Sequence, residues 1–160
     1  KHLLQEAVST YITRASLKLR KQNSLVNLIT VFINTNPFKE EPQYANSVHI
    51  KMPAPTDITS EMITHALNGL DVIYKEGYRY QKAGVMLSGI VASGGNQTTI
   101  FDTVDRQKLK LITQTVDKIN KKMGSEAIYY ASSGIKKVWN MKRNLKSPHY
   151  TTDWNSLPKV

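Results

Sequence analysis

The chain has 160 residues, and 40% of them are hydrophobic, which is enough for one domain with a buried core or for one domain and a small second unit. It contains no cysteine, which excludes disulfides and thiolate metal sites. Its longest apolar run, 28–33, is far shorter than the ~20 residues that cross a bilayer, and its first residues lack a signal-peptide pattern. We therefore expect a soluble, cytoplasmic protein without a membrane partner.

The net charge is +10, from 22 basic and 12 acidic residues, and it is unevenly distributed. Residues 1–90 carry 10 basic and 7 acidic side chains, whereas residues 91–160 carry 12 and 5. Lysine and arginine displace counterions from phosphates, so this excess favours a polyanionic partner such as nucleic acid. A basic surface that merely keeps the protein in solution is the alternative.

The first two predicted elements are a helix and a strand. An amphipathic helix is expected from about residue 3 to Gln22, because its apolar residues recur at helical spacing. The segment 25–34 is rich in β-branched residues and apolar on both faces, which predicts a well-covered strand. Pro37 and Pro42 bracket the loop that follows.

A second strand is predicted at 47–52, where apolar and polar residues alternate. Its polar, partly basic outer face includes His49 and Lys51. Pro53 and Pro55 are expected to end it.

A second helix and a third strand complete the first ninety residues. Asp57 or Thr59 can cap the helix, and Gly77 suits the C′ position after it. The segment 80–87 is predicted to form the third strand. The order helix–strand–strand–helix–strand predicts an α+β fold, a small sheet covered by two helices.

Beyond a linker at 88–99, apolar residues from Leu109 to Met123 step by three and four on a third helix, which Gly124 should stop. A short strand is predicted at 127–131. A basic segment, 136–146, and an irregular tail follow. Trp139 in the basic segment and Trp154 in the tail are candidates for core packing or for interface anchors.

No catalytic constellation is recognisable. The four histidines have no metal-ligand spacing, and no phosphate-binding glycine loop occurs. The only adjacent acidic pair, Glu40 and Glu41, lies in the proline-flanked loop without an obvious third carboxylate. We therefore expect no catalytic residues, no metal site and no cofactor in this chain.

Four stretches together resemble one family: NTNPF at 34–38, GYRYQKAGVML at 77–87, WNMKR at 139–143 and SPHYTT at 147–152. They are similar to the C-terminal part of UmuC, the catalytic subunit of the error-prone, Y-family translesion DNA polymerase V. The resemblance covers nearly the whole chain. It implies a little-finger DNA-binding domain at 1–90, a linker with a clamp-binding peptide at 91–103, and the UmuC-type C-terminal extension at 104–160.

The resemblance also implies a role. The palm, fingers and thumb, with the Mg²⁺-binding carboxylates of the parent polymerase, would lie upstream of this chain. What remains would be a non-catalytic, DNA-holding and partner-docking part of an enzyme of DNA repair and SOS mutagenesis. The implied partners are DNA, the sliding clamp, a UmuD-type accessory subunit and the RecA filament.

Family members carry a short peptide that inserts into a pocket on the sliding clamp. Gln97, Ile100 and Phe101 match its polar, aliphatic and aromatic positions, whereas Thr98 departs from the usual leucine. A linker that presents two apolar side chains suits an external pocket. The alternative is that Ile100 and Phe101 fold back onto the core of this chain.

For DNA binding, the sheet would face the duplex and contact mainly phosphates. The candidate residues are His49, Lys51, Arg79, Tyr80 and Lys82. Ordinary surface lysines and core or rim packing of the tyrosine are the alternatives. A competing hypothesis is a protein-interaction module that docks the clamp, the UmuD-type subunit or RecA and binds little DNA.

One departure concerns the sheet. Little fingers begin with a strand before the first helix, whereas this chain starts inside that helix. The resemblance therefore implies that one strand, an interior one, is missing. Residues 127–131 or a second copy of the chain are the candidates to fill the gap, because an exposed strand edge invites pairing.

Overall fold

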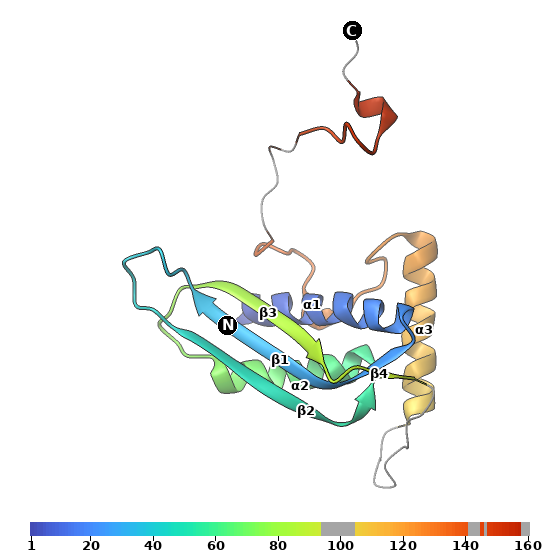
Figure 1. The fold of residues 1–160 in the computed structure, drawn as a ribbon, viewed down its shortest axis with the longest axis horizontal. Coiled ribbons are helices and arrows are strands. Elements are labelled where there is room, and N and C mark those ends of the chain that lie inside the picture. The colour runs from blue at the N-terminus through green and yellow to red at the C-terminus, as the bar shows by residue number, and fades with distance from the viewer. Residues whose placement is uncertain (94–104, 141–144, 146, 158–160) are drawn as a thin grey trace.

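The computed structural model describes residues 1–93, 105–140, 145 and 147–157, and it confirms an α+β fold (Figure 1). Two helices pack on one side of a small antiparallel sheet, and a third helix follows the sheet in the chain. The elements are α1 (His2–Lys21), β1 (Ser24–Thr35), β2 (Ala45–Thr56), α2 (Thr59–Ile73), β3 (Tyr80–Ser88), β4 (Val91–Ala92) and α3 (Arg106–Met123), with 3-10 turns at Ala131–Ser133 and Trp154–Ser156.

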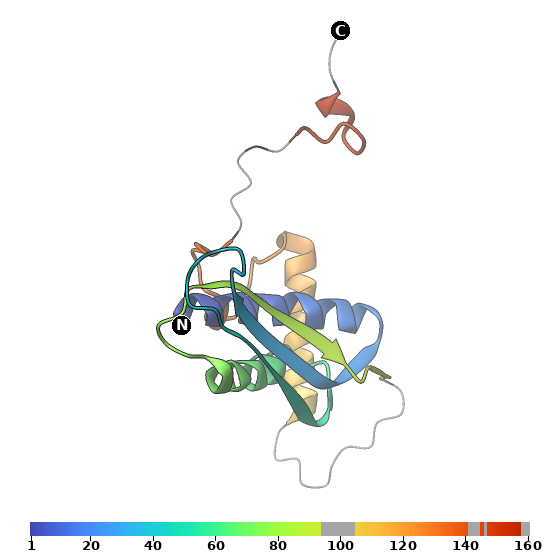
Figure 2. The same ribbon diagram turned by 60° about the vertical axis from the view of Figure 1, so that its left-hand side comes forward.

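The sheet is organised around β1. The strand order is β2-β1-β3, and the two-residue β4 pairs with the beginning of β1. On one face of β1, Ile29, Val31 and Ile33 are buried against α1 and α2, which lie side by side behind the sheet (Figures 1 and 2). β1 is the central strand and none of its residues is exposed, which confirms the predicted well-covered strand.

The core between the sheet and the helices is aliphatic. Each helix turns its apolar stripe inward, so these side chains leave water, at about 1.5–3 kcal/mol for each large one. The fully buried side chains of the helices include Val8, Ile12, Met62, Ala66 and Leu70.

The prediction that Pro53 and Pro55 end the second strand was wrong, since β2 continues to Thr56. β2 lies at the edge of the sheet, where proline is tolerated because its missing N–H need not bond a neighbouring strand. The register against β1 also shifts in this stretch, between Val26 and Leu28, so the ladder is interrupted there.

The termini of α2 also differ from the prediction. Neither Asp57 nor Thr59 caps the helix; Thr56 Oγ1 instead accepts a hydrogen bond from the N–H of Ile58 at 3.1 Å. α2 ends at Ile73, and Gly77, with φ +89°, serves the turn before β3 rather than the C′ position.

The sheet has no interior gap. Because β1 pairs directly with both β2 and β3, the prediction that the missing strand leaves a gap inside the sheet was wrong. Residues 127–131 form no strand either. The side chain of Asn120 bonds both the N–H and the C=O of Ile128, each at 2.8 Å, and so replaces a strand partner.

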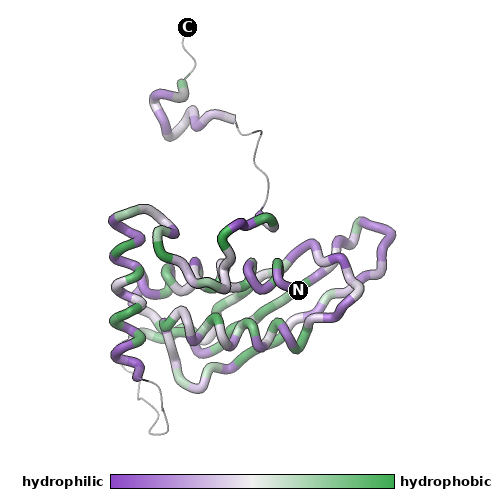
Figure 3. Tube along the Cα trace, turned by 180° about the vertical axis from the view of Figure 1, so that it is seen from behind, coloured by the Kyte–Doolittle hydropathy of each residue, from purple (hydrophilic) through white to green (hydrophobic). Residues whose placement is uncertain are grey.

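The helix α3 confirms the predicted stop at Gly124, but its apolar stripe is only partly covered. Within the described part of this helix, Thr113 is the only buried residue, and Ile112 and Met123 are 48% and 74% exposed. Seen from behind, hydrophobic and hydrophilic residues alternate along α3 (Figure 3).

Polar contacts attach α3 and the residues after it. Arg20 on α1 donates two hydrogen bonds to the Asp117 carboxylate, at 2.6 and 2.9 Å. Glu126 pairs with Arg14 at 3.6 Å and with Lys137 at 2.5 Å.

Both tryptophans are described. Trp139 packs edge-on against Tyr11 of α1, with 5.5 Å between ring centroids, so it contacts the chain's own fold. Trp154 is 88% exposed, which leaves it available to a partner.

Asp117→Asn tests the contribution of the Arg20 pair. The side chain of Arg20 is only 11% exposed, so its charge would lose its carboxylate partner in a poorly solvated place. We expect the free energy of unfolding, measured by urea denaturation, to fall by about 1–3 kcal/mol. The control is Glu41→Gln, which breaks the pair with Arg79, a side chain 79% exposed. It should cost less than about 1 kcal/mol, and equal losses would contradict the argument.

The contact of Glu126 predicts a pH dependence. The hydrogen bond from Lys137 lowers the pKa of Glu126 below its ordinary value of 4.5. The folded state then binds this proton more weakly than the unfolded state, so the stabilisation is present above pH 4.5 and is lost as the pH falls through the folded pKa. We expect Glu126→Gln to destabilise the protein at neutral pH and to lose this effect below pH 4.5. The exposed Glu76, changed to Gln, is the control. If Glu126→Gln lowered the free energy of unfolding by the same amount below pH 4.5 as at neutral pH, the prediction would be contradicted.

Candidate nucleic-acid interface

One face of the sheet is not covered by α1 or α2, and we call it the open face. Side chains alternate along a strand, so the residues of β1 between the buried ones point away from the helices. Their partners on β2 and β3 share this orientation because paired residues lie on the same side. The open face comprises Leu28, Thr30, Phe32 and Asn34 on β1, Ala45, Ser47, His49 and Lys51 on β2, and Lys82, Gly84, Met86 and Ser88 on β3.

Two lysines stand at opposite ends of the open face. Lys51 lies opposite Leu28, and Lys82 lies opposite Asn34 at the other end of β1. Both are exposed, and neither forms an ion pair with another described residue. The register thus places on one face the two lysines that sequence alternation singled out, each with its charge available to a ligand.

His49 lies on the same face of β2, between Ser47 and Lys51. Its Nδ1 is 2.9 Å from the hydroxyl of Thr30, and the ring is exposed. This hydrogen bond orients the imidazole and leaves its other nitrogen without a hydrogen-bond partner among the described residues.

The centre of the open face is apolar. The ring of Phe32 lies directly over Gly84, where a β-carbon would collide with it. Met86, beside Thr30, is 54% exposed. Sequence reasoning missed Phe32 and Met86 because an apolar residue in a strand is usually assigned to the core.

Arg79 and Tyr80 do not share the open face. Arg79 precedes β3 and pairs with Glu41 at 3.1 Å. The register shifts between Asn34 and Thr35, and Tyr80 packs against the core. Its hydroxyl donates to the C=O of Lys75 at 2.8 Å, and burial raises its pKa above 10.0. The structure therefore separates these two candidates from the lysines.

The loop between β1 and β2 carries a feature that sequence reasoning passed over. Phe38 at its tip is 95% exposed. The side chain of Gln43 holds this loop, because its amide donates to the C=O groups of Asn36, Lys39 and Glu41 at 2.8–3.0 Å. The same side chain accepts a hydrogen bond from the hydroxyl of Thr35 at 2.6 Å.

The predicted clamp-binding residues Gln97, Ile100 and Phe101 lie outside the described residues. Among residues 1–93, 105–140, 145 and 147–157, no three His, Asp or Glu side chains gather as metal ligands. In the same ranges no helix has the length and apolarity needed to cross a membrane.

The arrangement of the open face suits a nucleic-acid backbone better than a small substrate. Exposed cations at both ends match phosphates, and a flat apolar centre matches sugars.

Comparisons with known proteins agree with the resemblance in the sequence. The chain is 36% identical to the protein UmuC of Salmonella typhimurium strain LT2 over 159 residues, which are 98% of this chain and 38% of that protein. It is 39% identical to SamB of Salmonella typhimurium and 34% identical to MucB of Escherichia coli, each over 97% of this chain and 37% of the relative. The chain thus spans less than two fifths of these relatives. No solved structure matches it.

Two family models cover most of the chain. Residues 110–160 match a domain of unknown function, DUF4113. Residues 1–100, which hold the sheet with α1 and α2, match the impB/mucB/samB family C-terminal domain. The predicted kinship with UmuC is therefore confirmed, and the chain belongs to the impB/mucB/samB family, of which it carries the C-terminal domain.

Proposed function

We propose that this chain is the DNA-binding and partner-docking C-terminal part of an error-prone translesion DNA polymerase, in which it holds DNA without catalysing synthesis. The polymerase would act in DNA repair and SOS mutagenesis in the bacterial cytoplasm, with its Mg²⁺-dependent centre elsewhere in the longer protein. The observation that carries the proposal is the open face, with two exposed lysines around an apolar centre.

The spacing of the two lysines supports contacts with several nucleotides. Their partners Leu28 and Asn34 are six residues apart on β1, which at ~3.3 Å per residue corresponds to about 20 Å. Phosphates follow one another at ~3.4 Å of helix axis along a B-DNA strand, so this distance covers about six nucleotides. Lys51 and Lys82 would therefore bind different phosphates, with Phe32 and Met86 over the sugars between them.

Such contacts are independent of base sequence. A polymerase that copies damaged templates needs a hold on the duplex that does not depend on the bases, and phosphate contacts provide it. The net charge of +10 adds a long-range attraction to DNA.

Partner docking is the second part of the proposal. The sliding clamp would bind the peptide with Gln97, Ile100 and Phe101, and a UmuD-type subunit or RecA would bind elsewhere on the chain. Exposed aromatic side chains favour this role, since Phe38 is 95% and Trp154 is 88% exposed.

Lys51→Gln together with Lys82→Gln tests the DNA interface. We expect the chain to bind duplex DNA weakly, with log K falling by about 0.9 per phosphate contact for each unit of log salt. The double variant should make this slope shallower by the amount that corresponds to about two phosphate contacts. Fluorescence anisotropy of labelled duplexes at several salt concentrations measures it.

The matched control for this test is Lys108→Gln with Lys110→Gln, two exposed lysines of α3 outside the open face. It should leave the slope nearly unchanged. If both double variants lowered the affinity equally, net charge rather than the open face would account for binding.

Ile100→Ala with Phe101→Ala tests clamp docking. We expect loss of binding to the bacterial sliding clamp with little change in melting temperature, because these residues follow a glycine linker. Thr98→Leu should strengthen binding by about 1 kcal/mol through added apolar contact. Clamp titrations and thermal melts of the same proteins decide this. Retained clamp binding with a large drop in melting temperature would mean that the two side chains belong to the core.

A further inference from the structure

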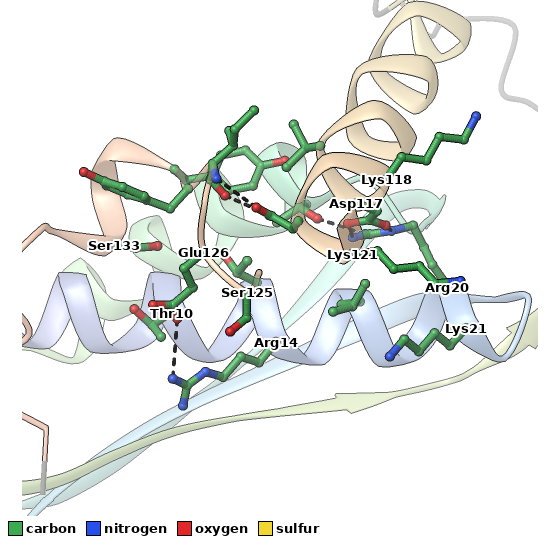
Figure 4. Close-up of a pocket in the computed structure, with 18 of the residues that line it drawn as sticks. Thr10, Arg14, Arg20, Lys21, Asp117, Lys118, Lys121, Ser125, Glu126 and Ser133 are labelled. Carbon is green, nitrogen blue, oxygen red and sulfur yellow. Dashed lines mark hydrogen bonds and ion pairs between the residues drawn. The ribbon is translucent and has the colours of Figure 1, made fainter. Parts of the chain in front are cut away.

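A second candidate surface lies away from the open face, between α1, α3 and residues 125–137 (Figure 4). These three segments, with Thr59 of α2, line a cavity of about 740 Å³ that is open to solvent on one side. Cavities of this size hold ligands of several hundred cubic ångströms, including the anchoring part of a peptide.

The walls of this cavity are partly apolar. Leu17 of α1, Val116 of α3 and Ile128 of the following segment contribute to them, together with Tyr129 and Tyr130. Leu17 is 36% and Ile128 is 41% exposed, so the chain leaves these side chains incompletely covered. An apolar side chain inserted between them would find contacts on three sides.

The charges around the cavity leave three lysines uncommitted. Arg20 is bound to Asp117, and Arg14 and Lys137 share Glu126, so both carboxylates of the cavity are already paired. The remaining cations, Lys21, Lys118 and Lys121, are exposed and have no ion-pair partner in the described ranges.

We infer that this cavity is a docking site for an acidic peptide of a partner protein, anchored by one bulky apolar side chain. The anchor enters between Leu17, Val116 and Ile128, and carboxylates of the peptide pair with the three lysines. The inference rests on the partner-docking half of the proposed function and is independent of DNA binding by the open face.

A nucleic-acid strand fits this cavity less well. Each nucleotide brings a phosphate charge of its own, and phosphates gain nothing from the apolar walls that Leu17, Val116 and Ile128 contribute. A peptide can place its apolar anchor at these walls and keep its carboxylates at the lysines. Charge and shape together favour the acidic peptide.

The test starts from short random peptides displayed on phage and selected on the 160-residue chain. The most enriched peptide is synthesised and titrated by fluorescence anisotropy. We expect acidic residues flanking one Leu, Ile, Phe or Trp. Lys118→Glu with Lys121→Glu should weaken binding by about tenfold or more, whereas Lys108→Glu with Lys110→Glu on the same helix should change it little.

The outcomes separate this inference from the proposed function. Enrichment of no peptide, of basic peptides, or of peptides that bind the Lys118/Lys121 variant normally would overturn it. A second result would also overturn it: the chain binds oligothymidylate and no peptide, and Lys118→Glu with Lys121→Glu alone abolishes that binding. The cavity would then be a site for single-stranded nucleic acid. The variant Lys51→Gln with Lys82→Gln should bind the peptide normally. A negative result for DNA binding by the open face therefore does not affect the test of the cavity, and a negative result for the cavity does not affect the test of the open face.

Discussion

Each strand pairing in the described structure involves β1, so the whole domain depends on the register of this one strand. One face of β1, with Ile29, Val31 and Ile33, is buried in the core. The other face, with Thr30 and Phe32, belongs to the open face of the sheet. A slip by one residue would exchange the two sets, with a large loss of burial, which is why the hydrophobic pattern specifies the register strongly. The same alternation that builds the core therefore sets which side chains a ligand meets.

The extension is attached by a different kind of interaction. α3 and the residues after it contact the domain through the pairs Asp117–Arg20, Arg106–Glu61 and Glu126–Arg14, and through the packing of Trp139 on Tyr11. Ion pairs fix orientation but cover little apolar surface, so the stripe of α3 stays partly exposed. This accounts for a cavity next to α1 where a hydrophobic contact would have left none.

Periodicity was sufficient to predict α1, β1, α2 and β3, because their apolar residues recur with the period of the element they form. The errors arose where tertiary context decides. Pro53 and Pro55 are tolerated only because β2 is an edge strand, and residues 127–131 find the side chain of Asn120 in place of a neighbouring strand. No local pattern contains either fact.

The candidate site was predictable to a similar degree. Alternation along a strand predicted that His49, Lys51 and Lys82 point outward, and the register puts all three on the open face. It failed for Tyr80, because a register shift turns that side chain toward the core. The cavity was beyond sequence reasoning, since it needs residues near 10–21 and 116–137 to meet in space.

The loop held by Gln43 has a consequence for affinity. Ordering a residue of a free loop costs about 1–2 kcal/mol in conformational entropy, and a binding partner normally bears that cost. Here the hydrogen bonds of Gln43 order the segment around Phe38 during folding. A surface that receives Phe38 would therefore retain most of the roughly 1.5–3 kcal/mol that burial of such a ring provides.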